Sequence, residues 1–134
     1  MSQYLHLRCG ELDCLLDIEC VQEVDILTAD DAQADHLLWR SQLLPVTRPG
    51  ALFGLHTQPT HRVVIRMDAH LHMLAVDAVL GLIAADAEDF RSFAPITATA
   101  DRCFDGALLQ DDGKCLLRLR RPLRWLETAD LPSL

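Results

Sequence analysis

Residues 15–24 read Leu-Leu-Asp-Ile-Glu-Cys-Val-Gln-Glu-Val, and the spacing of their apolar side chains changes partway along. The stretch begins as a strand-like apolar run and continues with Ile18, Val21 and Val24 at the three-residue spacing of a helix face. Asp17 stands at the change, where its carboxylate can accept hydrogen bonds from the first free N–H groups of a helix. We therefore predict a β-strand that leads directly into a very short helix.

The residues before this stretch have the pattern of a β-hairpin. Leu5 and Leu7 alternate with polar residues, as in a strand with one buried face. A Gly-Glu pair at residues 10–11 predicts a turn, and residues 12–18 return as the second arm. The chain is therefore expected to begin with β structure.

Most of the remaining chain also reads as short strands joined by turns and loops. The acidic, Ala-rich residues 28–35 predict an exposed loop, and residues 47–60 contain the Pro and Gly of a linker. Pro45 should place its strand toward a sheet edge or a strand end. The further predicted elements are strands at 37–40, 42–46 and 77–83, hairpins at 62–76 (with Asp68 in its turn) and 103–119, and single helical turns at 87–93 and 122–126.

The element count places the chain in the mainly β class. About eight to ten short strands with two or three single-turn helices are typical of one β-barrel or of a pair of barrels. With 134 residues, half of them hydrophobic, the chain can bury a core of its own. We expect one domain over residues 1–134.

The formal net charge of −8 argues against general attraction to nucleic acid or to an anionic membrane, because both require a positive protein surface. No stretch approaches the roughly 20 apolar residues of a membrane span, and residues 1–9 lack the apolar core of a signal peptide. We therefore expect a soluble, cytoplasmic protein whose partners are proteins. The five cysteines have no Cys-x-x-Cys spacing and are interpreted as small core residues: Cys9, Cys14, Cys20, Cys103 and Cys115.

The order of these motifs resembles the CheW-like domain family, the adaptor modules of bacterial chemotaxis arrays. The resemblance spans nearly the whole chain, from residue 4 to residue 126. The matching segments, in the order of the family, are Gly10 with Leu15-Leu16-Asp17-Ile18 and Val21-Gln22-Glu23-Val24; Leu38-Trp39-Arg40 with Leu44-Pro45-Val46; Val63-Val64-Ile65; Leu74-Ala75-Val76-Asp77-Ala78-Val79-Leu80-Gly81; and Asp105-Gly106.

This resemblance implies two SH3-like five-stranded β-barrel subdomains with short helices, packed side by side around an apolar groove. It implies no catalysis, and we also expect no cofactor and no metal. The implied partners are the regulatory domain of a histidine kinase and the cytoplasmic tip of a chemoreceptor. By matching positions, Val21 and Glu23 on the short helix would face the kinase. Arg40, Val63 and Val64 would line the receptor groove.

The chain departs from the family pattern at the surface near Arg40. The segment between Val24 and Arg40 is shorter than usual, and residues 28–36 replace the customary proline and glycine lead-in. Ser41 follows Arg40 where the family favours glycine. The loop that shapes the receptor side is therefore expected to differ.

Several other residues have more than one possible role. Because alternate strand residues share a face, His70 and His72 could bind a divalent metal with His61 or Asp68, although no third ligand has a recognisable spacing. Trp39 and Trp125 are core residues or interface anchors. The arginines near the carboxyl end form either a solvated strand face or a contact for an acidic protein partner: Arg118, Arg120, Arg121 and Arg124.

The sequence therefore predicts a non-enzymatic adaptor that couples chemoreceptors to a histidine kinase. No nucleophile, paired carboxylates or glycine-rich phosphate loop has a catalytic spacing. One alternative is a divergent adaptor of a pilus or surface-motility array. Another is a small ligand-binding or metal-binding β-barrel. Free β edges also allow a homodimer.

Overall fold

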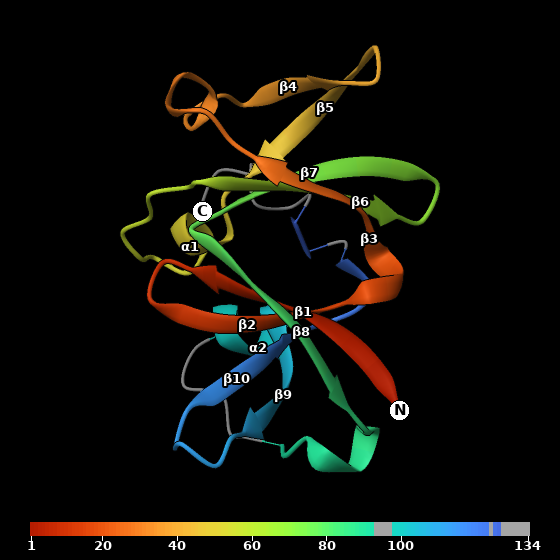
Figure 1. Cartoon of the computed structure of the whole chain (residues 1–134), viewed down its shortest axis with the longest axis vertical. Coiled ribbons are helices and arrows are strands. Elements are labelled where there is room, and N and C mark those ends of the chain that lie inside the picture. Colours follow the sequence, from red (N-terminus) through yellow and green to blue (C-terminus); the bar gives the residue numbers. More distant parts are fainter. Residues whose placement is uncertain (93–97, 124, 127–134) are drawn as a thin grey trace.

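The computed structural model describes residues 1–92, 98–123 and 125–126. Two five-stranded sheets form the two SH3-like β subdomains, here called barrel 1 and barrel 2, which lie one below the other in Figure 1. The strands are β1 (Ser2–Cys9), β2 (Leu12–Asp17), β3 (Val21–Ile26), β4 (His36–Trp39), β5 (Gln42–Thr47), β6 (His61–Met67), β7 (His70–Val76), β8 (Ala78–Ala85), β9 (Phe104–Leu109) and β10 (Cys115–Leu119). The helices are α1 (Pro49–Leu52) and α2 (Ala98–Cys103), with 3-10 turns at Ile18–Cys20, Ala29–Asp31 and Ala87–Asp89.

The two barrels share one plan of strand pairing. Barrel 1 has the order β8-β1-β2-β10-β9, and barrel 2 has the order β3-β6-β7-β5-β4. In each barrel the third and fourth strands pair in parallel, and the other neighbours pair antiparallel. Barrel 2 is formed by the middle of the chain, so barrel 1 contains the first hairpin together with the later strands. The mainly β, two-barrel prediction is confirmed.

The first hairpin and the junction after it form as the sequence predicts. Gly10 in the turn has a φ of +64°, and a Cβ there would lie 2.8 Å from the Cβ of Leu55, so this position requires glycine. Asp17 accepts a hydrogen bond from the backbone N–H of Glu19 at 2.9 Å and begins the 3-10 turn. The prediction that the helix extends through Val21 is wrong, because the turn ends at Cys20 and β3 begins at Val21.

The structure also corrects several other elements. Helix α2 was not predicted, and Cys103 ends this helix instead of beginning a strand. Pro45 does not place β5 at an edge, since β5 pairs with β4 before this residue and with β7 after it. The linker-like residues 47–60 contain α1, and Phe53 after it packs against the core. The predicted turns at 87–93 and 122–126 include Phe93 and Arg124, which lie outside the described residues.

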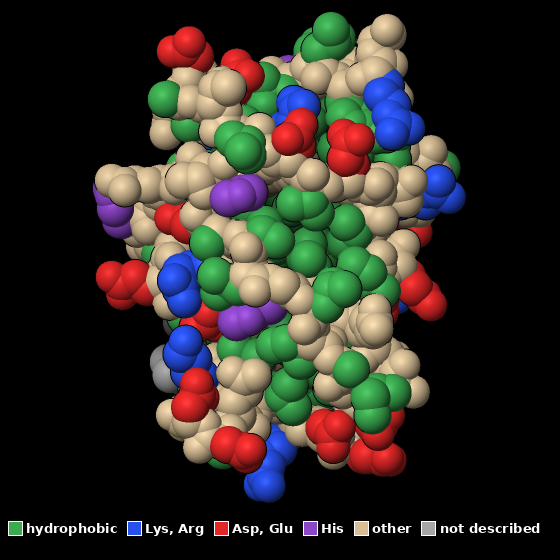
Figure 2. All heavy atoms as spheres, in the orientation of Figure 1, with side chains coloured by type: hydrophobic (Ala, Val, Ile, Leu, Met, Phe, Trp, Pro, Cys, Tyr) green, Lys and Arg blue, Asp and Glu red, His purple; other side chains and the backbone are tan. Residues whose placement is uncertain are grey.

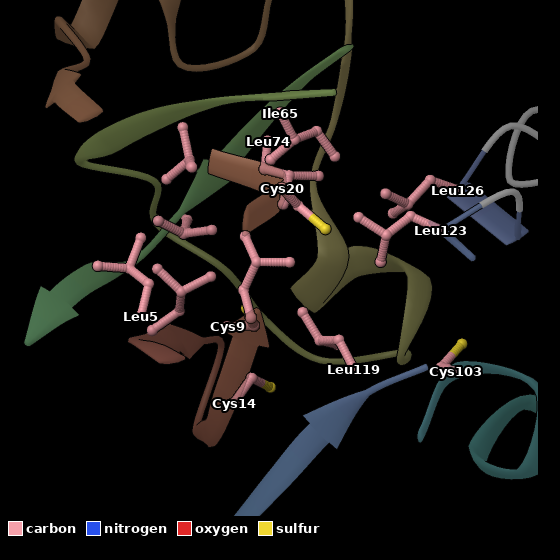
Figure 3. Close-up of a cluster of buried hydrophobic side chains, with 14 of the residues drawn as sticks. Leu5, Cys9, Cys14, Cys20, Ile65, Leu74, Cys103, Leu119, Leu123 and Leu126 are labelled. Atoms are coloured by element: carbon pink, nitrogen blue, oxygen red, sulfur yellow. The ribbon is translucent and has the colours of Figure 1, made fainter. Parts of the chain in front are cut away.

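The largest hydrophobic core lies between the barrels. Of the residues that the structure describes, seventeen buried ones form this junction core, against seven inside barrel 2 and four inside barrel 1. Figure 3 shows its side chains converging from both barrels, with Leu5 and Cys14 from barrel 1 and Ile65 and Leu74 from barrel 2. Each barrel therefore buries one face of its sheet against the other barrel.

Asp77, which stands between β7 and β8, holds the loop at residues 55–58 against the first hairpin. Its carboxylate accepts hydrogen bonds from the backbone N–H of Gly10 at 2.9 Å and of Gln58 at 2.7 Å. The hydroxyl of Thr57 donates a further one. A partly buried carboxylate that accepts several N–H and O–H hydrogen bonds forms a strong connection between segments, because these hydrogen bonds are charge-assisted. Asp77 therefore connects the crossing between the barrels to the glycine turn.

Candidate functional site

Strand β3 presents different side chains on its two faces. Val21 lies opposite Ile65, and Val24 lies opposite Val63, so both valines point to the side of the junction core. Ile26 continues this face and is 70% exposed. A β-bulge between Val21 and Glu23 shifts the register by one residue. This bulge lets residues three apart share one face of a strand.

Strand β8 of barrel 1 adds exposed leucines on the same side. Leu82 lies opposite the core residue Leu5 and is 57% exposed, while Leu80 stands at a second bulge and is 45% exposed. Figure 2 shows hydrophobic side chains gathered in the middle of this face, where the two barrels meet. We call this set the junction patch, and its members are Val21, Val24, Ile26, Leu80 and Leu82. An apolar patch of this kind on a folded chain is typical of protein contacts.

The other face of β3 carries a polar cluster. The indole N–H of Trp39 donates to one carboxylate oxygen of Glu23 at 2.5 Å, and the guanidinium of Arg40 approaches the other oxygen at 3.5 Å. The same guanidinium lies 4.6 Å from the centre of the Trp39 ring, which is a cation–π distance. This Glu23 cluster joins β3, one edge strand of the barrel 2 sheet, to the tip of the β4–β5 hairpin, which contains the other edge strand, β4.

The hairpin tip that carries Arg40 has an unusual backbone. Arg40 and Ser41 have φ values of +48° and +66°, which is the pattern of a two-residue turn that normally takes Asn-Gly or Gly-Gly. The turn aims the side chain of Arg40 outward, where it is 71% exposed. The local sequence therefore presents a charge at the end of barrel 2 at some cost in backbone strain.

The structure groups the five predicted contact residues differently from the family analogy. Val21 shares a face with Val63, whereas Glu23 pairs with Arg40, so the predicted division between kinase and receptor residues does not match the two faces of β3. Val63, the ladder partner of Val24, is fully buried in the junction core, and Val64 points into barrel 2 with 1% exposure. Consecutive strand residues face opposite sides, so these two valines belong to different cores, and neither lines an open groove.

The structure also corrects the prediction that the arginines near the carboxyl end form a solvated strand face or a contact for an acidic partner. Arg118 donates to Asp105 at 2.7 Å, and Arg121 donates to Asp17 at 2.9 Å. Burial alone would lower the pKa of Arg118, but the hydrogen bonds with Asp105 and Tyr4 outweigh burial and raise the pKa. The guanidinium of Arg120 donates to the carbonyl oxygen of Phe104 at 3.0 Å. These arginines therefore hold barrel 1 together; Arg124 lies outside the described residues.

The thiols and histidines offer no reactive arrangement in the described part of the chain. Cys9 is buried, and its pKa is raised by a hydrogen bond with Cys14 and by burial. Burial likewise raises the pKa of Cys20 and of Cys103, so these thiols stay protonated. Cys115 is exposed, which contradicts its predicted place in the core.

The histidine pair of β7 does not face solvent as a pair. The ring of His72 is buried and lies 2.6 Å from the hydroxyl of Thr47, whereas His70 is exposed. Among the described residues, no three His, Cys, Asp or Glu side chains are placed to hold a metal ion. No described helix is long and apolar enough to cross a membrane.

The fold and these surfaces define a class of protein: a rigid pair of SH3-like barrels with an apolar patch at the junction and a polar cluster at one end. The family model for the CheW-like domain matches residues 3–122, and the chain belongs to this family. The chain is also similar in structure to the scaffolding protein TtCheW of Thermoanaerobacter tengcongensis, with a TM-score of 0.72 and 20% identity over 89% of this chain and 88% of that one. No curated protein matches the sequence significantly.

Proposed function

We propose that this chain is a non-enzymatic adaptor that couples chemoreceptors to a histidine kinase in a chemotaxis-type signalling array. The observation that carries the proposal is the junction patch, where Ile26 and Leu82 from different barrels expose apolar side chains on one face. Membership in the CheW-like family and the likeness to a scaffolding protein support the same role. Such a role places the chain in the cytoplasm with its partners.

The two faces of β3 suit two partners. The junction patch is apolar and would accept the amphipathic helices of a receptor tip, since helices bind grooves and patches through apolar side chains at regular spacing. The Glu23 cluster is polar, projects from the end of barrel 2 and would contact the regulatory domain of the kinase. Because the junction core joins both barrels, the two partners would be held in a fixed relative orientation.

The experiment compares Leu82→Asp with Arg40→Glu in two separate binding assays. One assay measures sedimentation with receptor-containing vesicles, and the other measures binding to a purified kinase regulatory domain. Leu82→Asp should weaken receptor binding at least about tenfold, roughly 1.4 kcal/mol, and leave kinase binding nearly unchanged. Arg40→Glu should do the reverse.

Leu109→Asp is the matched control for an exposed leucine. Leu109 is 63% exposed on β9, outside both surfaces, so its replacement should change neither assay. Melting temperatures of all variants should stay close to that of the parent, because exposed side chains contribute little to folding. Equal loss of both partners in either variant would show a single shared surface and contradict the division. Retained binding of both partners in both variants would contradict the proposal itself.

A further inference from the structure

Barrel 2 has a depression at its open end. Its volume is about 460 Å³, and it lies between the start of β3, the tip of the β4–β5 hairpin and the β6–β7 hairpin. We call it the barrel 2 mouth. The residues that line it include Gln22, Trp39, Arg66, Asp68, His70 and Leu71.

One wall of the barrel 2 mouth is apolar and held in place. Trp39 and Leu71 both pack against the interior core of barrel 2. The hydrogen bond to Glu23 fixes the plane of the Trp39 ring, and the guanidinium of Arg40 covers part of it at 4.6 Å. A fixed indole beside a leucine forms a ready contact for an apolar side chain, because little rotamer entropy remains to be lost on binding.

An arginine without a side-chain partner among the described residues lies beside the apolar wall. Arg66 is exposed and lies across from Leu71 in the β6–β7 ladder, and its guanidinium makes no hydrogen bond or ion pair with another residue that the structure describes. His70 is also exposed at this end. Figure 2 shows Lys and Arg side chains near the tips of both hairpins. Asp68 also lines the mouth and has an interaction of its own within the chain.

A depression at the opposite end of the strand plan in barrel 1, where β1 and β9 begin, holds its arginines differently. The barrel 1 mouth, a depression of about 260 Å³, is lined by Tyr4, Asp17, Asp105, Arg118 and Arg121 among others. There each guanidinium has a carboxylate partner inside the chain, at 2.7 Å for Arg118 and 2.9 Å for Arg121. The unpaired guanidinium of the barrel 2 mouth is therefore available to a carboxylate from elsewhere.

We propose that the barrel 2 mouth binds an acidic segment of a protein partner. A carboxylate of this segment pairs with Arg66, and a neighbouring apolar side chain packs on Trp39 and Leu71. A guanidinium binds a carboxylate with two parallel hydrogen bonds, which gives the contact direction as well as strength. The proposal rests on the proposed function in one respect, namely that the chain acts by docking proteins.

The apolar wall selects among possible occupants. A free phosphate would use Arg66 and leave Trp39 uncovered, whereas a peptide satisfies both walls. A second copy of this chain could offer its own acidic loop at Ala29–Asp31, but the leucine next to that loop, Leu27, is buried and cannot also pack on the apolar wall. An acidic segment of another protein is the occupant that the surface fits.

The experiment uses the purified chain and two short synthetic peptides. One peptide alternates Glu with Leu, and the second replaces every Glu by Gln. Titration calorimetry measures affinity, and the NMR signal of the Trp39 indole N–H reports the place of binding. The Glu peptide should bind and shift this signal, while the Gln peptide should bind at least about tenfold more weakly, with the affinity falling as salt is added.

Three variants locate the contact. Arg66→Gln should lower the affinity for the Glu peptide about tenfold. Asp68→Asn should raise this affinity severalfold, because a competing carboxylate is removed. Asn tolerates the positive φ of residue 68, +52°, so the turn is preserved. Arg91→Gln, which removes an exposed arginine of the segment before β9, should have no effect.

Four results would overturn the inference: equal binding of both peptides, unchanged binding in Arg66→Gln, full displacement by millimolar inorganic phosphate, or peptide-free dimerisation that depends on Arg66. The peptide assay contains neither kinase nor receptor. Its failure therefore leaves the proposed function standing, and failure of the partner assays leaves a positive peptide result standing.

Discussion

Barrel 1 and barrel 2 have the same strand plan but differ in the pairing of the arginines that line their depressions. Barrel 1 has four buried apolar residues in its interior cluster, among those described, and adds charged groups that pair with each other. Arg118, for example, bonds to Asp105 and lies 4.1 Å from the centre of the Phe90 ring. Barrel 2 has seven buried apolar residues in its cluster and leaves Arg66 unpaired at its mouth. The arginines of the barrel 1 mouth thus stabilise the fold, whereas one guanidinium of the barrel 2 mouth remains available for contact.

The junction core explains how both arrangements can coexist in a short chain. It is larger than either interior cluster, and it buries side chains from both sheets. Because the shared core supplies much of the apolar burial, a barrel that packs against it does not need a large hydrophobic interior of its own. The residues at its outer end then contribute little to the stability of the fold. The comparison therefore predicts a strong effect for changes at the junction, a moderate one at the barrel 1 mouth and a small one at the barrel 2 hairpin tip.

The largest expected effect is that of Ile65→Ala in the junction core. Ile65 is fully buried between the barrels, so its truncation removes apolar contacts from both and should cost about 2–5 kcal/mol. Urea unfolding followed by circular dichroism should show one transition at lower denaturant with an unchanged slope. Leu109→Ala, an exposed leucine, should stay within about 0.5 kcal/mol of the parent. Two separate transitions would show that the barrels fold independently and would break the argument for a shared core.

Local patterns were sufficient to predict most strands and turns. Alternation in the first hairpin, the turn at Asp68 and the cap at Asp17 depend on residues close in sequence, and the structure has all three. The misassigned helix at Val21 and Val24 has a physical cause. The bulge after Val21 places residues three apart on one strand face, and this spacing is the same as that of a helix.

The surfaces could not be predicted in the same way, because they depend on contacts between distant segments. The exposure of Leu80 and Leu82 follows from the position of β8 at a sheet edge, and the burial of Val63 follows from packing against barrel 1. Arg121 finds its partner Asp17 more than a hundred positions earlier in the chain. Apolar alternation shows that a strand has two faces, but it does not show which of them another sheet covers.

The second prediction compares the two barrel mouths directly. Arg118→Gln removes a short ion pair and the contact with Phe90, which should cost about 1.5–3 kcal/mol because Asp105 loses a charged donor. Arg66→Gln should cost less than about 0.5 kcal/mol, since Arg66 has no partner among the described residues. Chemical denaturation of both variants measures the difference. Similar losses in the two variants would mean that Arg66 stabilises barrel 2 and is not reserved for a partner.

The smallest expected effect sharpens the comparison at the hairpin tip of barrel 2. Ser41 has a φ of +66°, where a Cβ is strained and glycine is not, so Ser41→Gly should raise the free energy of unfolding by about 0.5–1 kcal/mol. Ala69, the second residue of the β6–β7 turn, does not have a positive φ, so Ala69→Gly should give no gain.

Thermal unfolding measures both turn variants, and peptide binding at the barrel 2 mouth serves as a second readout. If Ser41→Gly stabilises the chain and leaves peptide affinity unchanged, the turn serves only to position Arg40. The backbone strain of the turn is then unrelated to peptide binding. A gain in stability with a loss of affinity would show that the strained turn helps to hold the Glu23 cluster in its binding geometry. Because the parent and variant differ only by one CH₂OH group on the outside of the turn, either result can be assigned to the backbone.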